Sequence, residues 1–246
     1  MKFRLNWKIT VFSAVCLGTF TWLGFWQMDR GDEKTRLVNE VMARREQPAV
    51  PLSILIEKPE APDGTPVLLE GTWDPDHVFL LDNRVLEGRV GFEVLVPFHD
   101  HGSDTHLLVN RGFVPMGRTR QEVPDIPPLT GAQQVTGYVY VAEDNVVVDT
   151  GGELVGQPPW PIIVQVADPV LLQLELDRAL YPHVIRLADS DPNALPRNWP
   201  VTTILPARHW GYAVQWFVMG FVVLAAWLAF SFRRSEDTKR DEEQDN

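Results

Sequence analysis

Two apolar stretches bracket this chain: residues 9–28 read ITVFSAVCLGTFTWLGFWQM, and residues 210–232 read WGYAVQWFVMGFVVLAAWLAFSF. Neither stretch contains Asp, Glu, Lys or Arg. A helix rises about 1.5 Å per residue, so each stretch is long enough to cross a hydrocarbon core roughly 30 Å thick. We therefore predict a membrane protein that meets the lipid bilayer through two transmembrane helices, over residues 9–28 and 209–232.

The first stretch could also be a cleaved secretory signal, because the basic residues Lys2, Arg4 and Lys8 precede it. A signal usually has an apolar core of about 7–15 residues that ends at small residues. This stretch is longer and ends in Phe25-Trp26-Gln27-Met28. We therefore expect an uncleaved anchor.

Basic residues beside the two spans predict how the chain crosses the membrane. They precede the first span within residues 1–8 and follow the second as Arg233 and Arg234, and such residues favour the cytoplasmic side. We expect a multi-pass protein of a bacterial inner membrane with both termini in the cytoplasm. Residues 29–208 would then form a periplasmic domain. The acidic tail, residues 233–246, is too polar to fold alone and would be a disordered cytoplasmic segment.

The segment between the spans is acidic, with 15 basic and 27 acidic residues among residues 29–208. This balance argues against nucleic acid as a partner, because phosphate contacts need Lys and Arg. The one cysteine of the chain, Cys16, lies inside the first span. We therefore expect no disulfide, C-x-x-C redox site or thiolate copper site between the spans.

The same segment reads as one mainly-β domain of the α+β class with antiparallel strands. A helical pattern continues from the first span over Glu33–Gln47 and should end at Pro48. A short helix should begin at Asp168-Pro169 and continue to about Leu180. Short runs rich in β-branched residues predict strands joined by tight turns, and the first four should form an antiparallel meander. The strands are expected at Val67–Leu69, Val78–Leu81, Phe92–Val96, His106–Val109, Gln134–Val141, Ile162–Val166 and His183–Leu187.

The start of the second span carries the sharpest candidate site. His209, Tyr212 and Trp216 stand at i, i+3 and i+7, so they share one helical face. Trp22 and Trp26 should lie at the same depth, near the outer end of the first span. The two helices could then form an aromatic slot capped by an imidazole, which is a common axial ligand of haem iron. The alternative is an ordinary belt of aromatic residues at the membrane interface.

Six blocks of sequence stand in order along nearly the whole chain, from about Leu23 to Phe217. They read LGFWQ from Leu23, GTW from Gly71, DNR from Asp82, GFEV from Gly91, VNRGFVP from Val109 and HWGYAVQWF from His209. Together these blocks resemble the surfeit locus family of cytochrome c oxidase assembly proteins.

This resemblance implies a two-span protein that assists the maturation of oxidase subunit I and is not an enzyme. Bacterial members are associated with haem a, and the family's proposed haem ligand corresponds to His209. The rings of Tyr212, Trp216, Trp22 and Trp26 would then shape the site. Subunit I of cytochrome c oxidase is the expected partner, and a haem a synthase is a further candidate.

Two other functions stay open at this point. One is a membrane scaffold that binds oxidase subunits but no cofactor. The other is a membrane-anchored hydrolase, although the chain has no G-x-S-x-G, G-x-x-x-x-G-K-[ST] or H-E-x-x-H motif.

Two further sets of polar residues have open roles. Arg84 and Arg111 could pair with carboxylates inside the domain, or they could bind carboxylates of a cofactor or partner. His99, His101 and His106 lie within eight residues. They could bind a metal ion, or they could simply occupy a polar hairpin tip.

Overall fold

The structure is a computed structural model that describes residues 6–57, 62–117, 122, 124–129, 134–141, 159–202 and 204–232. It divides into two compact units, one of residues 1–39 with 201–246 and one of residues 40–200. The first unit is helical and the second is built on a β sheet. The acidic tail that we predict to be disordered, residues 233–246, lies outside the described residues.

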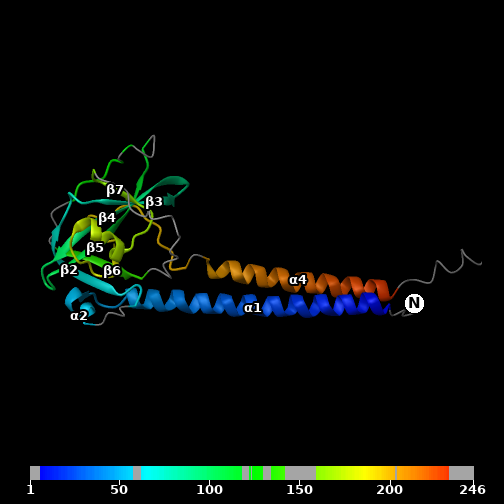
Figure 1. Cartoon of the computed structure of the whole chain (residues 1–246). Coiled ribbons are helices and arrows are strands. Elements are labelled where there is room, and N and C mark those ends of the chain that lie inside the picture. The colour runs from blue at the N-terminus through cyan, green and yellow to red at the C-terminus, as the bar shows by residue number, and fades with distance from the viewer. Residues whose placement is uncertain are drawn as a thin grey trace, which may run out of the picture. The chain divides into compact units, whose positions relative to one another are not determined.

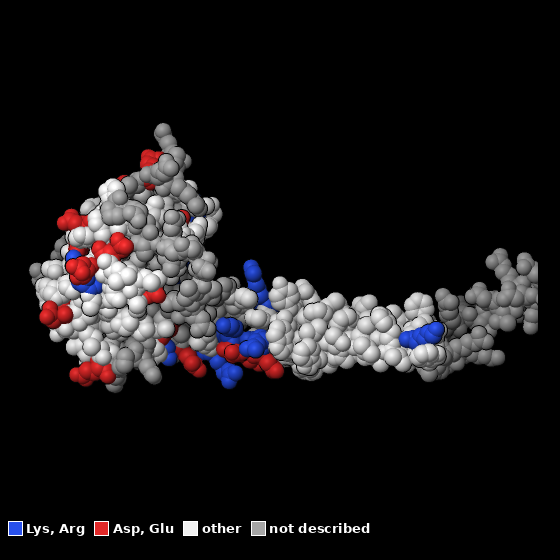
Figure 2. Space-filling view, in the orientation of Figure 1, with Lys and Arg blue, Asp and Glu red and all other residues white. Residues whose placement is uncertain are grey.

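Two long helices make up most of the described part of the first unit. They are α1, Trp7–Arg45, which belongs to this unit as far as residue 39, and α4, Pro206–Ser231. Figure 1 shows them side by side, and in Figure 2 the middle of the pair bears no charge. Both are long and apolar enough to cross a membrane. The prediction is therefore confirmed: two helices that are long and apolar enough to span a membrane flank a β-rich domain in the sequence.

Helix α1 extends well beyond the predicted span, and it confirms the helical extension predicted over Glu33–Gln47. Its last turns, from residue 40 onward, belong to the β unit. There Val41 is buried, and the Arg45 guanidinium lies 5.2 Å from the centroid of the Tyr138 ring. These contacts hold the end of α1 against strand β6, Gln134–Tyr140.

A sheet of eight strands forms the described part of the second unit, in the order β1-β2-β6-β8-β5-β4-β3-β7. Strand β2 also pairs with β4, so β2, β6, β8, β5 and β4 close into a small barrel. The pairs β1–β2, β3–β7 and β5–β8 are parallel and the others are antiparallel. The other elements of this unit are β1 Val50–Pro51, α2 Leu52–Ile56, β2 Pro66–Trp73, β3 Phe79–Leu86, β4 Arg89–Asp100, β5 Thr105–Pro115, β7 Ile162–Val164, α3 Pro169–Leu176 and β8 Val184–Leu187.

The far end of β4 closes the barrel. Its first part pairs with β3, and Phe98–Asp100 then pair with Gly71–Trp73 of β2. Position 71 requires glycine, because an added Cβ would lie 1.8 Å from the carbonyl oxygen of His99. The predicted meander is confirmed for β3, β4 and β5. It is wrong for β2, which pairs with the distant β6 and not with β3.

Each predicted strand overlaps an observed one, and the predicted short helix is α3. The Asp168 carboxylate caps α3 by accepting a hydrogen bond of 2.9 Å from the Val170 amide. The helix ends earlier than predicted, at Asp177, which adopts a left-handed conformation with φ of 48°. The closed barrel buries an apolar core that fixes these elements, and its members include Val67, Leu69, Phe98, Leu107, Val109, Val135, Val139, Ile185 and Leu187.

Candidate functional site

Helices α1 and α4 meet along a seam of small residues. Between Thr10 and Gly31 of α1, buried or partly buried residues recur alternately three and four positions apart, as in a coiled coil. Small residues let helix backbones approach closely in a membrane. The buried residues of α1 up to residue 39 and of α4 are all small: Ser13, Gly24 and Gly31 on α1, and Ala213, Gly220 and Ser231 on α4.

His209 lies on this seam and contacts Gln27 of α1. The His209 Nδ1 and Gln27 Oε1 atoms are 2.8 Å apart, and the imidazole is partly buried. An amide oxygen can only accept, so Nδ1 carries the proton and donates it. In the neutral ring the Nε2 atom then keeps its lone pair, and no described residue forms a hydrogen bond with it. This is the tautomer that binds a metal through Nε2 while a second group holds the ring in place.

Aromatic rings fill the seam next to this pair. The ring centroids of Phe20 and Trp216 are 5.6 Å apart, and Phe217 meets Phe25 edge to face at 5.4 Å. Gly24 makes room for this packing, since an added Cβ would lie 2.7 Å from the Phe217 ring. The space between the helices at this level is therefore occupied by the protein's own rings.

The structure brings together only part of the predicted aromatic site. His209 and Trp216 lie on the seam, and Tyr212 flanks it with 49% of its surface exposed. Trp22 and Trp26 lie on the opposite side of α1, because a helix turns about 100° per residue. They are 65% and 41% exposed. The slot that we expected these five side chains to form between the helices is not present.

The site predicted from the sequence does not include Gln27, which contacts His209, or Phe20, which contacts Trp216. The signal that identifies them is the spacing of small residues along α1, which marks the face that packs. Large aromatic residues at a membrane interface prefer the headgroup region. Trp22 and Trp26 therefore mark the outward face of α1 and not the face that meets α4.

This geometry is better suited to a group bound through one exchangeable bond to His209 than to a cofactor enclosed between the helices. The Nε2 lone pair of His209 is the type of donor that haem iron accepts. Because rings fill the seam, a macrocycle bound there would lie against the outer surface of the helix pair. Tyr212 and Trp216 are the predicted aromatic residues that share its helix face.

Arg111 in the β unit is a structural residue. It is 2% exposed, and its Nε and Nη1 atoms donate to the carbonyl oxygens of Asn193 and Pro127 at 3.0 and 2.9 Å. Burial lowers the pKa of the guanidinium, and Asp191 opposes that shift. Arg111 thus binds backbone carbonyls, and it is too enclosed to bind a partner's carboxylate.

The three histidines after Phe98 lie at the hairpin tip between β4 and β5. The His99 and His106 rings stack at 4.4 Å, and His101 meets His99 edge to face at 5.3 Å. The His99 Nε2 atom is 2.9 Å from Asp104 Oδ1. No group of three or more His, Cys, Asp or Glu side chains within the described ranges could hold a metal ion. The structure therefore supports the polar hairpin tip and not the metal site.

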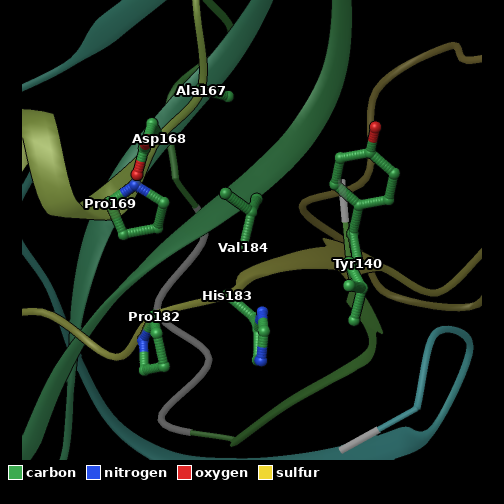
Figure 3. Close-up of a pocket in the computed structure, with 8 residues that line it drawn as sticks. Tyr140, Ala167, Asp168, Pro169, Pro182, His183 and Val184 are labelled. Atoms are coloured by element: carbon green, nitrogen blue, oxygen red, sulfur yellow. The ribbon is translucent and has the colours of Figure 1, made fainter. Parts of the chain in front are cut away.

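A cavity of about 150 Å³ lies beside the start of α3 (Figure 3). His183, which directly precedes β8, and Tyr140 of β6 line it, and the Tyr140 hydroxyl is turned away from His183. Asp168, also in its wall, caps α3. None of the described residues that line this cavity is Ser, Thr or Cys. The cavity therefore provides no support for a serine- or cysteine-type hydrolase.

Comparison with known proteins extends over both helices and the β unit. The sequence profile described as the SURF1 family matches residues 14–221. An uncharacterised SURF1-like protein of Mycobacterium tuberculosis is 34% identical over 125 residues, which cover 49% of this chain and 44% of that protein.

Animal proteins named Surfeit locus protein 1 are also similar. The protein of Mus musculus is 25% identical over 155 residues, covering 57% of this chain and 49% of its own length. The protein of Homo sapiens is 26% identical over 154 residues, covering 56% and 50%. The chain thus spans about half the length of the curated relatives that it matches.

Proposed function

The chain belongs to the SURF1 family, and from that premise we propose that it assists the assembly of cytochrome c oxidase by holding haem a for delivery to subunit I. Haem a is the cargo in this proposal and not a resident cofactor. A haem a synthase would be the donor and subunit I the acceptor.

The observation that carries the proposal is the 2.8 Å hydrogen bond between His209 Nδ1 and Gln27 Oε1. In the neutral imidazole it selects the tautomer whose Nε2 lone pair is free to bind iron. The bond also aims the ring, since the second partner of a ligating histidine sets its orientation. A carrier benefits from holding its cargo by one such bond, because a single bond can be exchanged for a ligand of the acceptor.

The neighbouring residues would supply the surface against which the macrocycle lies. Trp216 is held by its contact with Phe20, and Tyr212 presents an exposed ring one turn from His209. These rings offer apolar area, while the Tyr212 hydroxyl can remain in the headgroup region. Trp22 and Trp26, on the far side of α1, would instead contact lipid or a partner helix.

The site would lie at the outer surface of the membrane. Basic residues at both ends of the chain favour a cytoplasmic location for the termini, and residues 29–208 would then lie in the periplasm. Fusing alkaline phosphatase after residue 120 and, separately, after residue 246 tests this orientation. The first fusion should be active and the second inactive, and the reverse result would contradict the proposed side of the site.

The full chain, purified from cells that make haem a, tests the role of His209. The wild-type protein should show a Soret band, and His209→Ala should lose most of it. His209→Gly should regain the band when free imidazole is added, because the small molecule replaces the missing ligand. His101→Ala is the matched control, since it removes an exposed imidazole from the hairpin tip and should leave the band unchanged.

A cofactor-free scaffold predicts a different set of results. Wild-type protein would then co-purify with oxidase subunit I while carrying no haem, and His209→Ala would keep both properties. An unchanged Soret band in His209→Ala would remove this residue as the ligand even if haem is bound elsewhere.

A further inference from the structure

A second candidate binding site lies in the β unit, where β3 carries an irregularity. The pairing of β3 with β4 shifts between Leu81 and Arg84, and Asn83 adopts a left-handed conformation with φ of 60°. Such a bulge changes the direction of the following side chain. The residue whose direction it sets is Arg84.

Arg84 lines a cavity of about 190 Å³. A water molecule occupies about 30 Å³ of liquid, so the cavity accommodates roughly six waters, or one small group of a ligand. Its wall combines polar and apolar side chains. The lining residues are Asn83, Arg84, Val85, Leu86, Glu93, Phe113, Arg197 and Asn198.

The Arg84 guanidinium is not matched by a counter-ion in the described part of the chain. Its Nε atom is buried and makes no hydrogen bond, and no described carboxylate forms an ion pair with it. A buried donor without a partner is rare and costly in proteins. Arg84 therefore lines the cavity without a counter-ion among the described residues.

The other charged groups of the cavity already have partners. Glu93 accepts hydrogen bonds from Asn110 Nδ2 at 2.6 Å and Trp199 Nε1 at 3.0 Å, and it also interacts with Arg186. Arg197 pairs with Asp189, which is exposed, and donates to the Leu195 carbonyl at 2.8 Å. Arg84 is thus the group left to bind an incoming anion, with Arg197 adding positive charge nearby.

We propose that this cavity binds the carboxylate of a small organic acid. The planar N–H groups of a guanidinium suit the two oxygens of a carboxylate. The apolar side chains of Val85, Leu86 and Phe113 would take the hydrocarbon stem, which inorganic phosphate lacks. This site is independent of the proposed haem role, because it uses none of the residues of the helix pair.

Calorimetric titration of the full chain in detergent tests the site, with sodium butyrate as the probe and sodium chloride at equal ionic strength as the reference. Wild-type protein should bind butyrate with a roughly millimolar Kd, as a ligand of so few atoms allows. Arg84→Gln should weaken binding by about tenfold or more, since it removes a charge-assisted hydrogen bond. Arg84→Lys should also weaken it, because it keeps the charge but loses the planar edge.

Arg89→Gln is the matched control, since Arg89 is exposed on the same hairpin, and its butyrate binding should equal that of wild type. Unfolding midpoints measured without ligand establish that each variant is folded. If Arg84→Gln does not fold, Arg84→Lys takes its place as the test variant. Equal butyrate binding by wild type and both Arg84 variants would overturn the proposal. Heat from phosphate but none from butyrate would overturn it as well.

Discussion

In the proposed site Gln27 would act through His209, whose imidazole it contacts. Its oxygen holds the proton of His209 Nδ1 in place. Gln27→Leu removes the acceptor and leaves the ring free to turn or to change tautomer. Loss of such a partner typically lowers metal affinity by about 10- to 100-fold. We expect haem a to dissociate correspondingly faster from Gln27→Leu, measured by transfer to apomyoglobin.

Gln215→Leu is the control for that measurement, because Gln215 is an exposed residue of α4 and the substitution is chemically identical. It should release haem at the wild-type rate. Gln27→Glu should retain the cargo, since a carboxylate also accepts from Nδ1. Equal dissociation rates in wild type and Gln27→Leu would mean that the hydrogen bond does not orient the ligand.

At the scale of the element, the α1–α4 seam depends on residues without large side chains. An added Cβ at Gly24 would lie 2.7 Å from the Phe217 ring, whereas one at Gly18 would meet nothing within 4 Å. Gly24→Leu should therefore force the helices apart. Gly18→Leu, on the same helix, should not.

Chemical cross-linking measures this difference. The Trp227 Nε1 atom donates to Thr10 Oγ1 at 3.1 Å, so cysteines at these two positions face each other across the seam. In a Cys16→Ser background, a short bismaleimide should join Thr10→Cys to Trp227→Cys efficiently. Adding Gly24→Leu should sharply reduce the yield, and adding Gly18→Leu should leave it unchanged. Equal yields in the two variants would contradict close packing at Gly24.

The elements themselves follow from local sequence, which is why both spans, the extension of α1 and the strands could be predicted. Asp168 and Pro169 are a start signal that works within a single helical turn. The barrel could not be predicted, because its closure depends on β2 meeting the end of β4 and the distant β6. Gly71 marks that crossing, but an isolated glycine in a strand does not say which backbone approaches it.

The site was only partly predictable for a related reason. Shared helical faces within α4 follow from spacing, so His209 and Trp216 could be grouped correctly. Which face of α1 meets α4 depends on packing between segments about 180 residues apart in sequence. Trp22 and Trp26 are the largest aromatic residues of this part of α1. Small residues such as Gly24 and Gly31 instead determine which face of α1 packs against α4.

At the scale of the whole molecule, charge is distributed so that the stability of the β unit should respond to mild acid. The chain has a formal net charge of −11 with His neutral. Carboxylates titrate mostly below about pH 5, so between pH 7.5 and 5.5 the histidines dominate the change. Partial relief of the negative charge would by itself favour the folded state at lower pH. The local environment of His106 acts in the opposite direction.

Burial, with further effects of His99 and Arg178, lowers the pKa of His106 from its ordinary value of 6.5, while Asp104 and Asp74 oppose the shift. Above about pH 6.5 the ring is neutral in the folded and unfolded chain, so the full stability is present. As the pH falls below 6.5, the unfolded chain takes up the proton more readily, and stability is lost. Through His106, the urea midpoint should therefore decrease between pH 7.5 and 5.5.

His106→Phe isolates this effect, because phenylalanine keeps a flat ring against His99 but has no proton to bind. The downward contribution to its urea midpoint at lower pH should be absent, so its pH profile should differ from that of wild type. The comparison requires the full chain in one detergent, with unfolding followed by tryptophan fluorescence. Parallel pH profiles for the two proteins would mean that net charge or other histidines control the response, and that the stacked pair at the hairpin tip does not.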